Sequence, residues 1–96
     1  MKIKILDAAE RDLIEGFHFY ERQAPGLGQY FLDSIYADIE SLYIYYGTHP
    51  QHFDFHRLLA RRFPFAVYYK VESEFIKIYA VLDCRQNPDT TIKRLN

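Results

Sequence analysis

The sequence has one cysteine, no tryptophan, four glycines and four prolines among its 96 residues. A single cysteine, Cys84, excludes an internal disulfide and fits a reducing compartment. No stretch approaches the roughly 20 consecutive apolar residues that span a membrane. Charges interrupt the short apolar run that follows Met1, which is not the pattern of a signal peptide. We therefore expect a cytoplasmic protein with no membrane partner.

An excess of charge is also missing, since 12 Lys and Arg face 13 Asp and Glu. Proteins that mainly grip phosphates usually carry a strong basic excess, because neutralised phosphates supply most of the binding energy. Any basic site must therefore be local. Aromatic side chains, by contrast, are abundant, with nine Tyr and eight Phe. They suit a small core that is continuous with a contact surface, and the length suits one domain over residues 1–96.

The first quarter of the chain predicts a strand and a helix. Residues 1–6 alternate isoleucine with lysine, as in a half-buried strand. Asp7, with Glu10 three residues later, has the spacing of a capping box that opens a helix. Gly16 weakens this helix and leaves room for a close helix–helix approach. Its apolar residues recur at helical spacing: Ala9, Leu13, Ile14, Phe17, Tyr20 and Ala24.

A second helix is predicted over residues 29–46, after a turn at Pro25, Gly26 and Gly28. Gly47 ends it. Its apolar stripe comprises Phe31, Leu32, Ile35, Ile39, Leu42 and Tyr46, and its outward residues include Asp33, Asp38 and Glu40. Two amphipathic helices joined by a short turn form an antiparallel hairpin, and a sheet must cover their apolar faces.

That sheet is predicted as an antiparallel meander over residues 56–62, 65–71 and 75–84. In the last strand Ile76, Ile78, Ala80 and Leu82 are expected on one face, and Lys77, Tyr79, Asp83 and Arg85 on the other. Residues 86–96 show no clear periodicity and are expected to form a C-terminal tail. The predicted fold class is α+β: an N-terminal strand, a helical hairpin and a three-stranded meander, with the helices packed on one face of the sheet.

Two segments resemble a known protein family. Residues 61–89, RRFPFAVYYKVESEFIKIYAVLDCRQNPD, are similar to the C-terminal half of the RelE/ParE toxins of bacterial type II toxin–antitoxin systems. Residues 9–35, AERDLIEGFHFYERQAPGLGQYFLDSI, are similar to that family's first helix, Pro-Gly-Leu-Gly turn and second-helix start. The resemblance covers about residues 3–90, and the turn together with the Phe-Pro-Phe segment is its most specific part.

The resemblance implies a RelE/ParE-like fold and a cognate antitoxin as partner. It also implies one of two activities. RelE-like members cleave mRNA on the ribosome, whereas ParE-like members are associated with poisoning DNA gyrase and are not known for catalysis. The Pro-Gly-Leu-Gly turn favours the ParE-like branch.

A ribonuclease would need a base, an acid and cations around the scissile phosphate. Arg61, Tyr79 and Arg85 are the candidate catalytic residues under this alternative. After Arg85 the chain has no His, Tyr or Glu, and Asp89 is its only carboxylate. The sequence therefore lacks a convincing acid–base set, although a ribosome-dependent endoribonuclease and a degenerate, non-toxic family member both stay open.

The sequence also contains candidate residues for a metal site and for a reactive cysteine. His49, His52 and His56 surround Asp54, but their spacing is not that of a recognised zinc site, so surface histidines are the simpler interpretation and no metal is predicted. Cys84 is expected to be a small buried hydrophobe rather than a nucleophile. No phosphate-binding glycine loop is present, and no cofactor is predicted.

The sequence thus favours a binding protein over an enzyme. The hypothesis is a ParE-like toxin whose polar sheet face and tail contact an essential enzyme, with DNA gyrase as first candidate. The predicted partner-binding residues are Arg61, Arg62, Tyr68, Lys77, Tyr79, Asp83 and Arg85. For the arginines, an ordinary solvated strand face is the competing interpretation.

Overall fold

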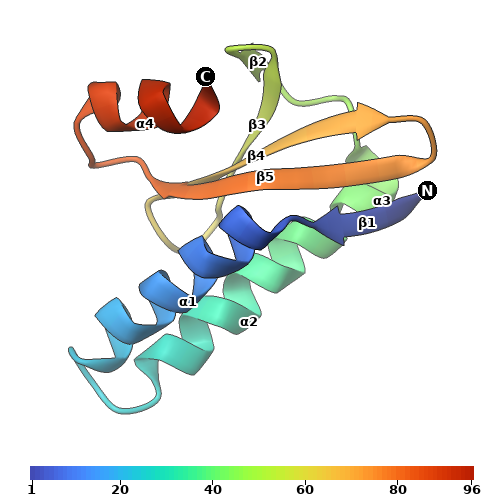
Figure 1. Ribbon diagram of the computed structural model, residues 1–96. Helices are drawn as coiled ribbons and strands as arrows, with labels where there is room; N and C mark the ends of the chain where they lie inside the picture. Colours follow the sequence, from blue (N-terminus) through green and yellow to red (C-terminus); the bar gives the residue numbers. More distant parts are fainter.

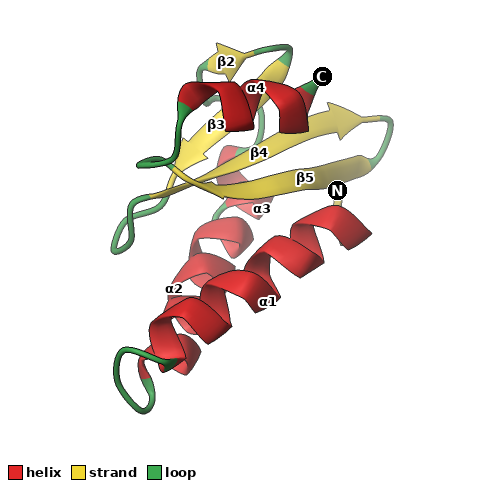
Figure 2. Ribbon diagram, turned by 60° about the vertical axis from the view of Figure 1, so that its left-hand side comes forward, coloured by secondary structure: helices red, strands yellow, loops and turns green.

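A five-stranded sheet with helices on both faces makes up the structure, a computed structural model that describes residues 1–96 (Figure 1). The elements are β1 (Lys2–Ile5), α1 (Asp7–Glu21), α2 (Leu27–Glu40), α3 (Leu42–Tyr45), β2 (Gln51–His52), β3 (Phe55–Leu59), β4 (Phe65–Glu72), β5 (Phe75–Asp83) and α4 (Pro88–Leu95). The strand order is β1-β5-β4-β3-β2, with β1 parallel to β5 and all other pairs antiparallel. This confirms the predicted α+β class. Helices α1 and α2 lie on one face of the sheet and α4 lies on the other (Figure 2).

The two long helices form the predicted hairpin, and glycines bring them close together. A Cβ atom at Gly16 would lie 2.5 Å from the Phe31 ring, and one at Gly28 would lie 2.6 Å from the Phe17 carbonyl oxygen. Neither position has room for a side chain, so the expected close approach at Gly16 is confirmed. The prediction of a capping box is wrong, because Leu6 occupies the N-cap position and no side chain caps α1. Asp7 instead begins the helix, where its carboxylate favours the positive end of the helix dipole.

The second helix is shorter than predicted. It is interrupted at Ser41, whose hydroxyl donates to the Asp38 carbonyl at 2.6 Å, and α3 continues for one turn before Gly47, which has φ +79°. Asp38, expected to point outward, is only 5% exposed. Its carboxylate accepts a hydrogen bond from the Arg61 backbone N–H at 3.2 Å. The buried carboxylate of Asp38 is tolerated because it pairs with a backbone donor of the loop between β3 and β4.

The meander β3-β4-β5 is confirmed, but one face assignment is wrong. Tyr68 pairs with Ala80 while Tyr69 pairs with Ile78, so Tyr79 is an extra residue in β5. This β-bulge shifts the side-chain alternation by one position. Ile76 and Ile78 face α1 and α2, as predicted. Ala80 and Leu82, which were predicted on the same face, point to the opposite face and belong to a second core cluster. Val81 takes their place in the main core.

Residues 86–96 contain helix α4 rather than a tail without regular structure. Asn87 caps it through a hydrogen bond from the Asp89 N–H at 2.9 Å, and Pro88 follows at the first position of the helix. Leu95 is buried against the sheet face opposite α1, together with Phe55, Ala66, Tyr68, Ala80 and Leu82. Part of the face that was predicted to be open is thus covered.

Strands β2 and β3 form a short hairpin between α3 and β4. Its two turn residues, Phe53 and Asp54, have φ values of 54° and 68°, and a two-residue loop with both φ values positive is the turn that suits the twist of a hairpin.

No helix of the structure combines the length and the apolarity that crossing a membrane requires.

Candidate functional site

The seven residues predicted to bind a partner do not form one site. Arg61, Arg62 and Arg85 lie at the end of the sheet where the loop between β3 and β4 meets the end of β5, since the Cys84 N–H donates to the Pro64 carbonyl at 2.8 Å. Lys77 and Tyr79 lie farther along β5, toward its hairpin with β4. The predicted surface is therefore divided into an arginine end and a lysine–tyrosine part.

At the arginine end, Arg85 is held by Asp83. Its Nε and Nη2 atoms donate to the two Asp83 carboxylate oxygens at 3.0 and 2.8 Å. The hydrogen bonds from Arg85 hold the pKa of Asp83 below its usual range, and the same pair raises the pKa of Arg85. Arg85 Nη2 also donates to the Tyr20 hydroxyl at 3.4 Å. Asp83 and Arg85 are thus partners of each other.

In the lysine–tyrosine part, Glu72 organises the neighbouring side chains. Tyr79 donates its hydroxyl hydrogen to Glu72 Oε2 at 2.7 Å, and Lys77 Nζ lies 4.0 Å from the same oxygen. The hydrogen bond to Glu72 raises the pKa of Tyr79, with a further contribution from burial. Lys70 Nζ sits 4.5 Å above the centroid of the Phe55 ring, a cation–π arrangement.

Tyr68 is not available to a partner. Its side chain is 5% exposed because α4 covers it, and its hydroxyl accepts a hydrogen bond from Arg57 Nε at 3.1 Å. The prediction placed Tyr68 on an open face, which is wrong because the tail was not expected to fold back. Cys84 is also placed differently from its prediction: it is exposed rather than buried, and its sulfur lies 3.5 Å from Arg57 Nη2.

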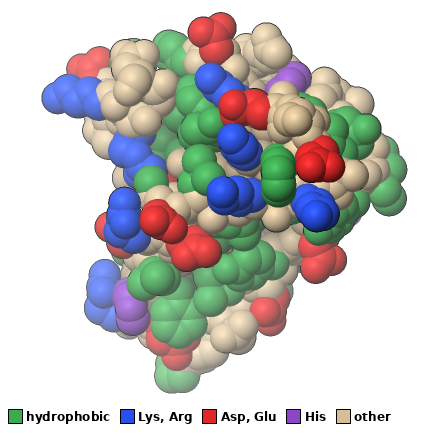
Figure 3. Space-filling view, turned by 45° about the vertical axis from the view of Figure 1, so that its right-hand side comes forward, with side chains coloured by type: hydrophobic (Ala, Val, Ile, Leu, Met, Phe, Trp, Pro, Cys, Tyr) green, Lys and Arg blue, Asp and Glu red, His purple; other side chains and the backbone are tan.

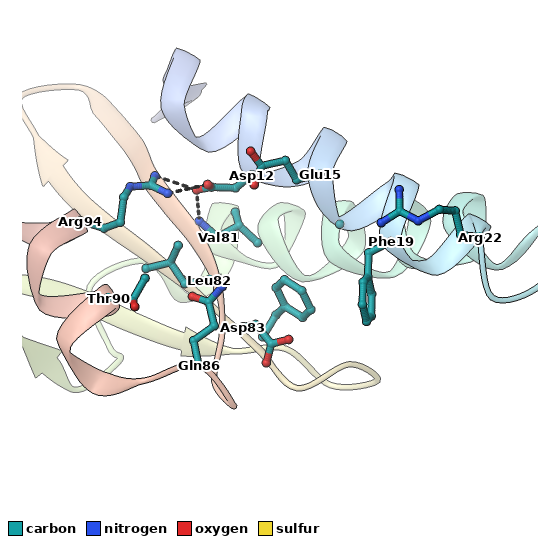
Figure 4. Close-up of a pocket in the computed structure, with 12 residues that line it drawn as sticks. Asp12, Glu15, Phe19, Arg22, Val81, Leu82, Asp83, Gln86, Thr90 and Arg94 are labelled. Atoms are coloured by element: carbon teal, nitrogen blue, oxygen red, sulfur yellow. Dashed lines mark hydrogen bonds and ion pairs between the residues drawn. The ribbon is translucent and has the colours of Figure 1, made fainter.

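A groove of about 460 Å³ runs between α1, the end of β5 and α4 (Figure 4). At its wall Arg94 donates to both carboxylate oxygens of Asp12, at 2.6 and 2.9 Å, and Asp12 also accepts the Val81 backbone N–H at 3.0 Å. These contacts tie α1, β5 and α4 together. Asp12 is 8% exposed. Its position beside Leu13, a residue of the apolar stripe of α1, was a signal in the sequence that the prediction missed, because a buried acid requires a partner.

The histidine-rich segment stabilises a turn. The Tyr69 hydroxyl accepts the Gly47 backbone N–H at 3.0 Å and contacts His49 Nδ1. The His56 ring stacks on the Tyr69 ring, and His56 Nδ1 lies 2.8 Å from the His49 carbonyl oxygen. Burial lowers the pKa of His49, with a smaller contribution from His56. His49 and His56 thus pack around one buried tyrosine.

No protein-family model matches the sequence, and no curated protein resembles it significantly. Among solved structures, a chain of the "Chromosomal ParDE TA system from P. aeruginosa" superimposes with a TM-score of 0.78 at 20% sequence identity. The superposition covers 84% of this chain and 92% of that chain. The two chains share one fold. The predicted fold is therefore confirmed.

Proposed function

We propose that this chain is the toxin of a type II toxin–antitoxin pair, of the ParE-like kind. It acts in the cytoplasm by binding and inhibiting an essential enzyme, with DNA gyrase as first candidate, and a cognate antitoxin neutralises it. The observation that carries this proposal is the fold shared with a chain of a ParDE toxin–antitoxin system over most of both lengths. The resemblance of residues 3–90 to the RelE/ParE toxins predicts the same function.

Inhibition by contact is favoured over RNA cleavage because the candidate catalytic residues do not converge. Tyr79 is four residues from Asp83 along β5, about 13 Å at the rise of a strand. Its hydroxyl donates to Glu72, toward the hairpin and away from Arg85. The guanidinium of Arg85 is itself occupied by Asp83. A base, an acid and a cation within reach of a single phosphate are a minimum for this chemistry, and these three side chains do not provide them.

The arginine end is the proposed contact with the target enzyme. Arg61 and Arg62 are exposed in the loop between β3 and β4, and Arg85 keeps 57% of its side chain exposed despite its bond to Asp83. Arginine is enriched where proteins make strong contacts, because its planar head combines charge with stacking. Tyr68, covered by α4, is left out of the proposed surface.

Expression in bacteria tests the proposal. Induction should arrest growth, reduce plasmid supercoiling and trigger a DNA-damage response while reporter transcripts stay intact. With purified components, the protein should inhibit supercoiling by gyrase. Arg61→Glu with Arg62→Glu should weaken that inhibition about tenfold or more, whereas Lys93→Glu, an exposed change on α4, should not.

Two other outcomes would overturn the proposal. Ribosome-dependent cuts detected by primer extension would establish the endoribonuclease alternative. Undisturbed growth with abundant folded protein would show a chain that keeps the fold without toxicity. Co-expression with the product of an adjacent short gene, one with a DNA-binding half and a charged amphipathic half, should restore growth and yield a co-purifying complex.

A further inference from the structure

The loop of residues 60–64, between β3 and β4, has an ordered backbone. At its start the Ala60 N–H donates to the Phe65 carbonyl at 2.9 Å, and at its end the Pro64 carbonyl accepts the Cys84 N–H at 2.8 Å. The ring of Pro64 also fixes its own φ angle. Both ends of the loop are therefore tied to the sheet.

The ring of Phe63 anchors the middle of this loop to the two long helices. Its centroid lies 4.8 Å from that of Tyr20 and 5.1 Å from that of Phe31, and both of these residues are buried. On its outer side the Phe63 ring lies 5.6 Å from the ring of Tyr30 on α2, which is 49% exposed. The loop thus continues into an exposed aromatic side chain.

A buried carboxylate holds the same loop at its first arginine. Asp38 of α2 is 5% exposed and accepts the Arg61 backbone N–H at 3.2 Å. Burial raises the pKa of Asp38, and the hydrogen bond from Arg61 and the charges of Arg61 and Arg62 oppose that rise. The loop backbone and its two cations therefore share one buried counter-charge, which favours the ordered arrangement.

The guanidinium groups of this loop have no ion-pair partner. Arg61 and Arg62 are exposed and take part in no salt bridge of the structure, whereas Arg85, the third member of the arginine end, pairs with Asp83. Figure 3 shows another arrangement, a face on which Lys and Arg side chains lie among Asp and Glu side chains. The loop thus presents two unpaired cations on a backbone that is already fixed.

We propose that residues 60–64, with Tyr30 beside them, form a pre-ordered contact loop for a protein surface that bears carboxylates around an apolar residue. Each arginine would bind a carboxylate through two parallel hydrogen bonds, and Tyr30 would pack on the apolar residue. Because the backbone is ordered before binding, little conformational entropy is lost on contact. The inference rests on the proposed function only where it identifies that surface as part of the target enzyme.

Carboxylates are favoured over phosphates as ligands of this loop. The planar head of arginine suits both groups. A nucleic acid, however, is held by the neutralisation of many phosphates along its backbone. The contact loop offers only Arg61 and Arg62, in a chain whose formal net charge is −1.

Titration of the purified full chain with synthetic peptides, followed by NMR of the backbone amides, tests the inference. A peptide in which two Glu flank one Leu should shift the signals of residues 60–64 and Tyr30, with an affinity that falls as salt rises. The same peptide with Gln in place of Glu should bind at least about tenfold more weakly. Single-stranded DNA of equal charge should bind more weakly than the Glu peptide.

Three results would overturn the inference. Equal binding of the Glu and Gln peptides would remove the role of the carboxylates. Shifts confined to other parts of the chain would place the contact elsewhere. Tighter binding of the DNA would assign the loop to nucleic acid instead. These measurements use no gyrase, so their outcome is independent of the growth and supercoiling assays that test the toxin function.

Variants separate the charge of the loop from its order, with circular dichroism confirming the fold of each. Arg61→Gln with Arg62→Gln should weaken binding of the Glu peptide about tenfold, and Lys93→Gln on α4 should leave it unchanged.

Asp38→Asn keeps both arginines but replaces the buried counter-charge with a weaker acceptor. Its loop amides should exchange hydrogen faster, and binding of the Glu peptide should fall about threefold. Asp33→Asn, at an exposed position of the same helix, makes the same change in net charge and should not weaken binding. Charge alone would strengthen the binding of an acidic peptide to either variant, so undiminished binding to Asp38→Asn would overturn the role of pre-ordering. The wild-type comparison of the two peptides decides the partner chemistry even where a variant does not fold.

Discussion

At the scale of single residues, Gly16 sets how closely α1 and α2 can approach. An added methyl group would meet the Phe31 ring at 2.5 Å, and that ring cannot swing away, because Phe31 is fully buried against Tyr20, Phe63 and Phe65. We expect Gly16→Ala to lower the free energy of unfolding by about 1–3 kcal/mol, the usual cost of overpacking. Alanine would favour the helix by roughly 1 kcal/mol if space were available.

Urea denaturation measures this difference. Glu10→Ala, at an exposed position of the same helix, is the matched control and should change stability by less than about 0.5 kcal/mol. An equal or increased stability of Gly16→Ala would show that the helices can separate without cost.

Phe53 is a position where a substitution should stabilise the protein. Its φ of 54° is left-handed, which is unfavourable for a bulky aromatic residue and readily adopted by asparagine, and its side chain is 50% exposed. Phe53→Asn should therefore raise the free energy of unfolding by about 0.5–1 kcal/mol. Phe53→Ala, which loses the ring but has no such preference for positive φ, should not produce this gain in thermal or urea denaturation.

At the scale of elements, one ion pair helps to fix the position of α4, beside the packing of Leu95. Removing Arg94 would leave the carboxylate of Asp12, 8% exposed, with only the Val81 N–H as partner. Unpairing a fully buried charge costs about 3–5 kcal/mol. Because a third of the Arg94 side chain is exposed, solvent screens the pair, and we expect Arg94→Gln to cost about 1–3 kcal/mol.

Hydrogen exchange should show increased opening of α4 in this variant before the rest of the molecule opens. Asp12→Asn combined with Arg94→Gln should recover part of the lost stability, since no unpaired charge remains. Additive losses in the double variant would argue that the two side chains act separately.

The elements also show what the sequence could and could not predict. The helical hairpin and meander follow from periodicity and turn residues, because each long helix and each strand carries its own apolar pattern. The bulge at Tyr79 does not, since no glycine or proline marks it and the apolar run of β5 is compatible with either face. Helix α4 was missed because only Leu95 and its neighbour Ile92 are apolar at helical spacing, while the cap Asn87 followed by Pro88 was a usable signal. The partners of Asp12 and Asp38 come from distant parts of the chain, which periodicity cannot reveal.

At the scale of the whole molecule, stability should depend on pH through His49. Burial lowers its pKa in the folded state below the ordinary value of about 6.5. The unfolded chain therefore takes up a proton at higher pH than the folded one, and the favourable contribution of neutral His49 is complete above that ordinary value and is lost as the pH falls below it. A protonated ring could no longer accept the hydroxyl hydrogen of Tyr69 at Nδ1.

His49→Asn keeps a polar atom near the position of Nδ1 but does not titrate. Its free energy of unfolding should change less than that of the wild type between pH 7.5 and 5, when both are measured in urea. His18→Asn, at an exposed site of α1, should keep the wild-type slope. Asp38, whose pKa is raised by burial, acts in the opposite direction in both proteins, so the difference between them isolates His49. A wild-type slope in His49→Asn would contradict the assignment.

The parallel pairing of β1 with β5 has a consequence for the order of folding during synthesis. Lys4 meets Lys77 across a ladder that cannot form until nearly the whole chain has been made. Until then β1 is a short strand without a neighbour, and the helices that follow it have no sheet to cover. Closing so long a loop is slow, because the loss of chain entropy precedes the contacts that offset it. Growing chains that end before β5 should therefore remain unfolded, and the β1 edge should be the last part of the sheet that the fold completes.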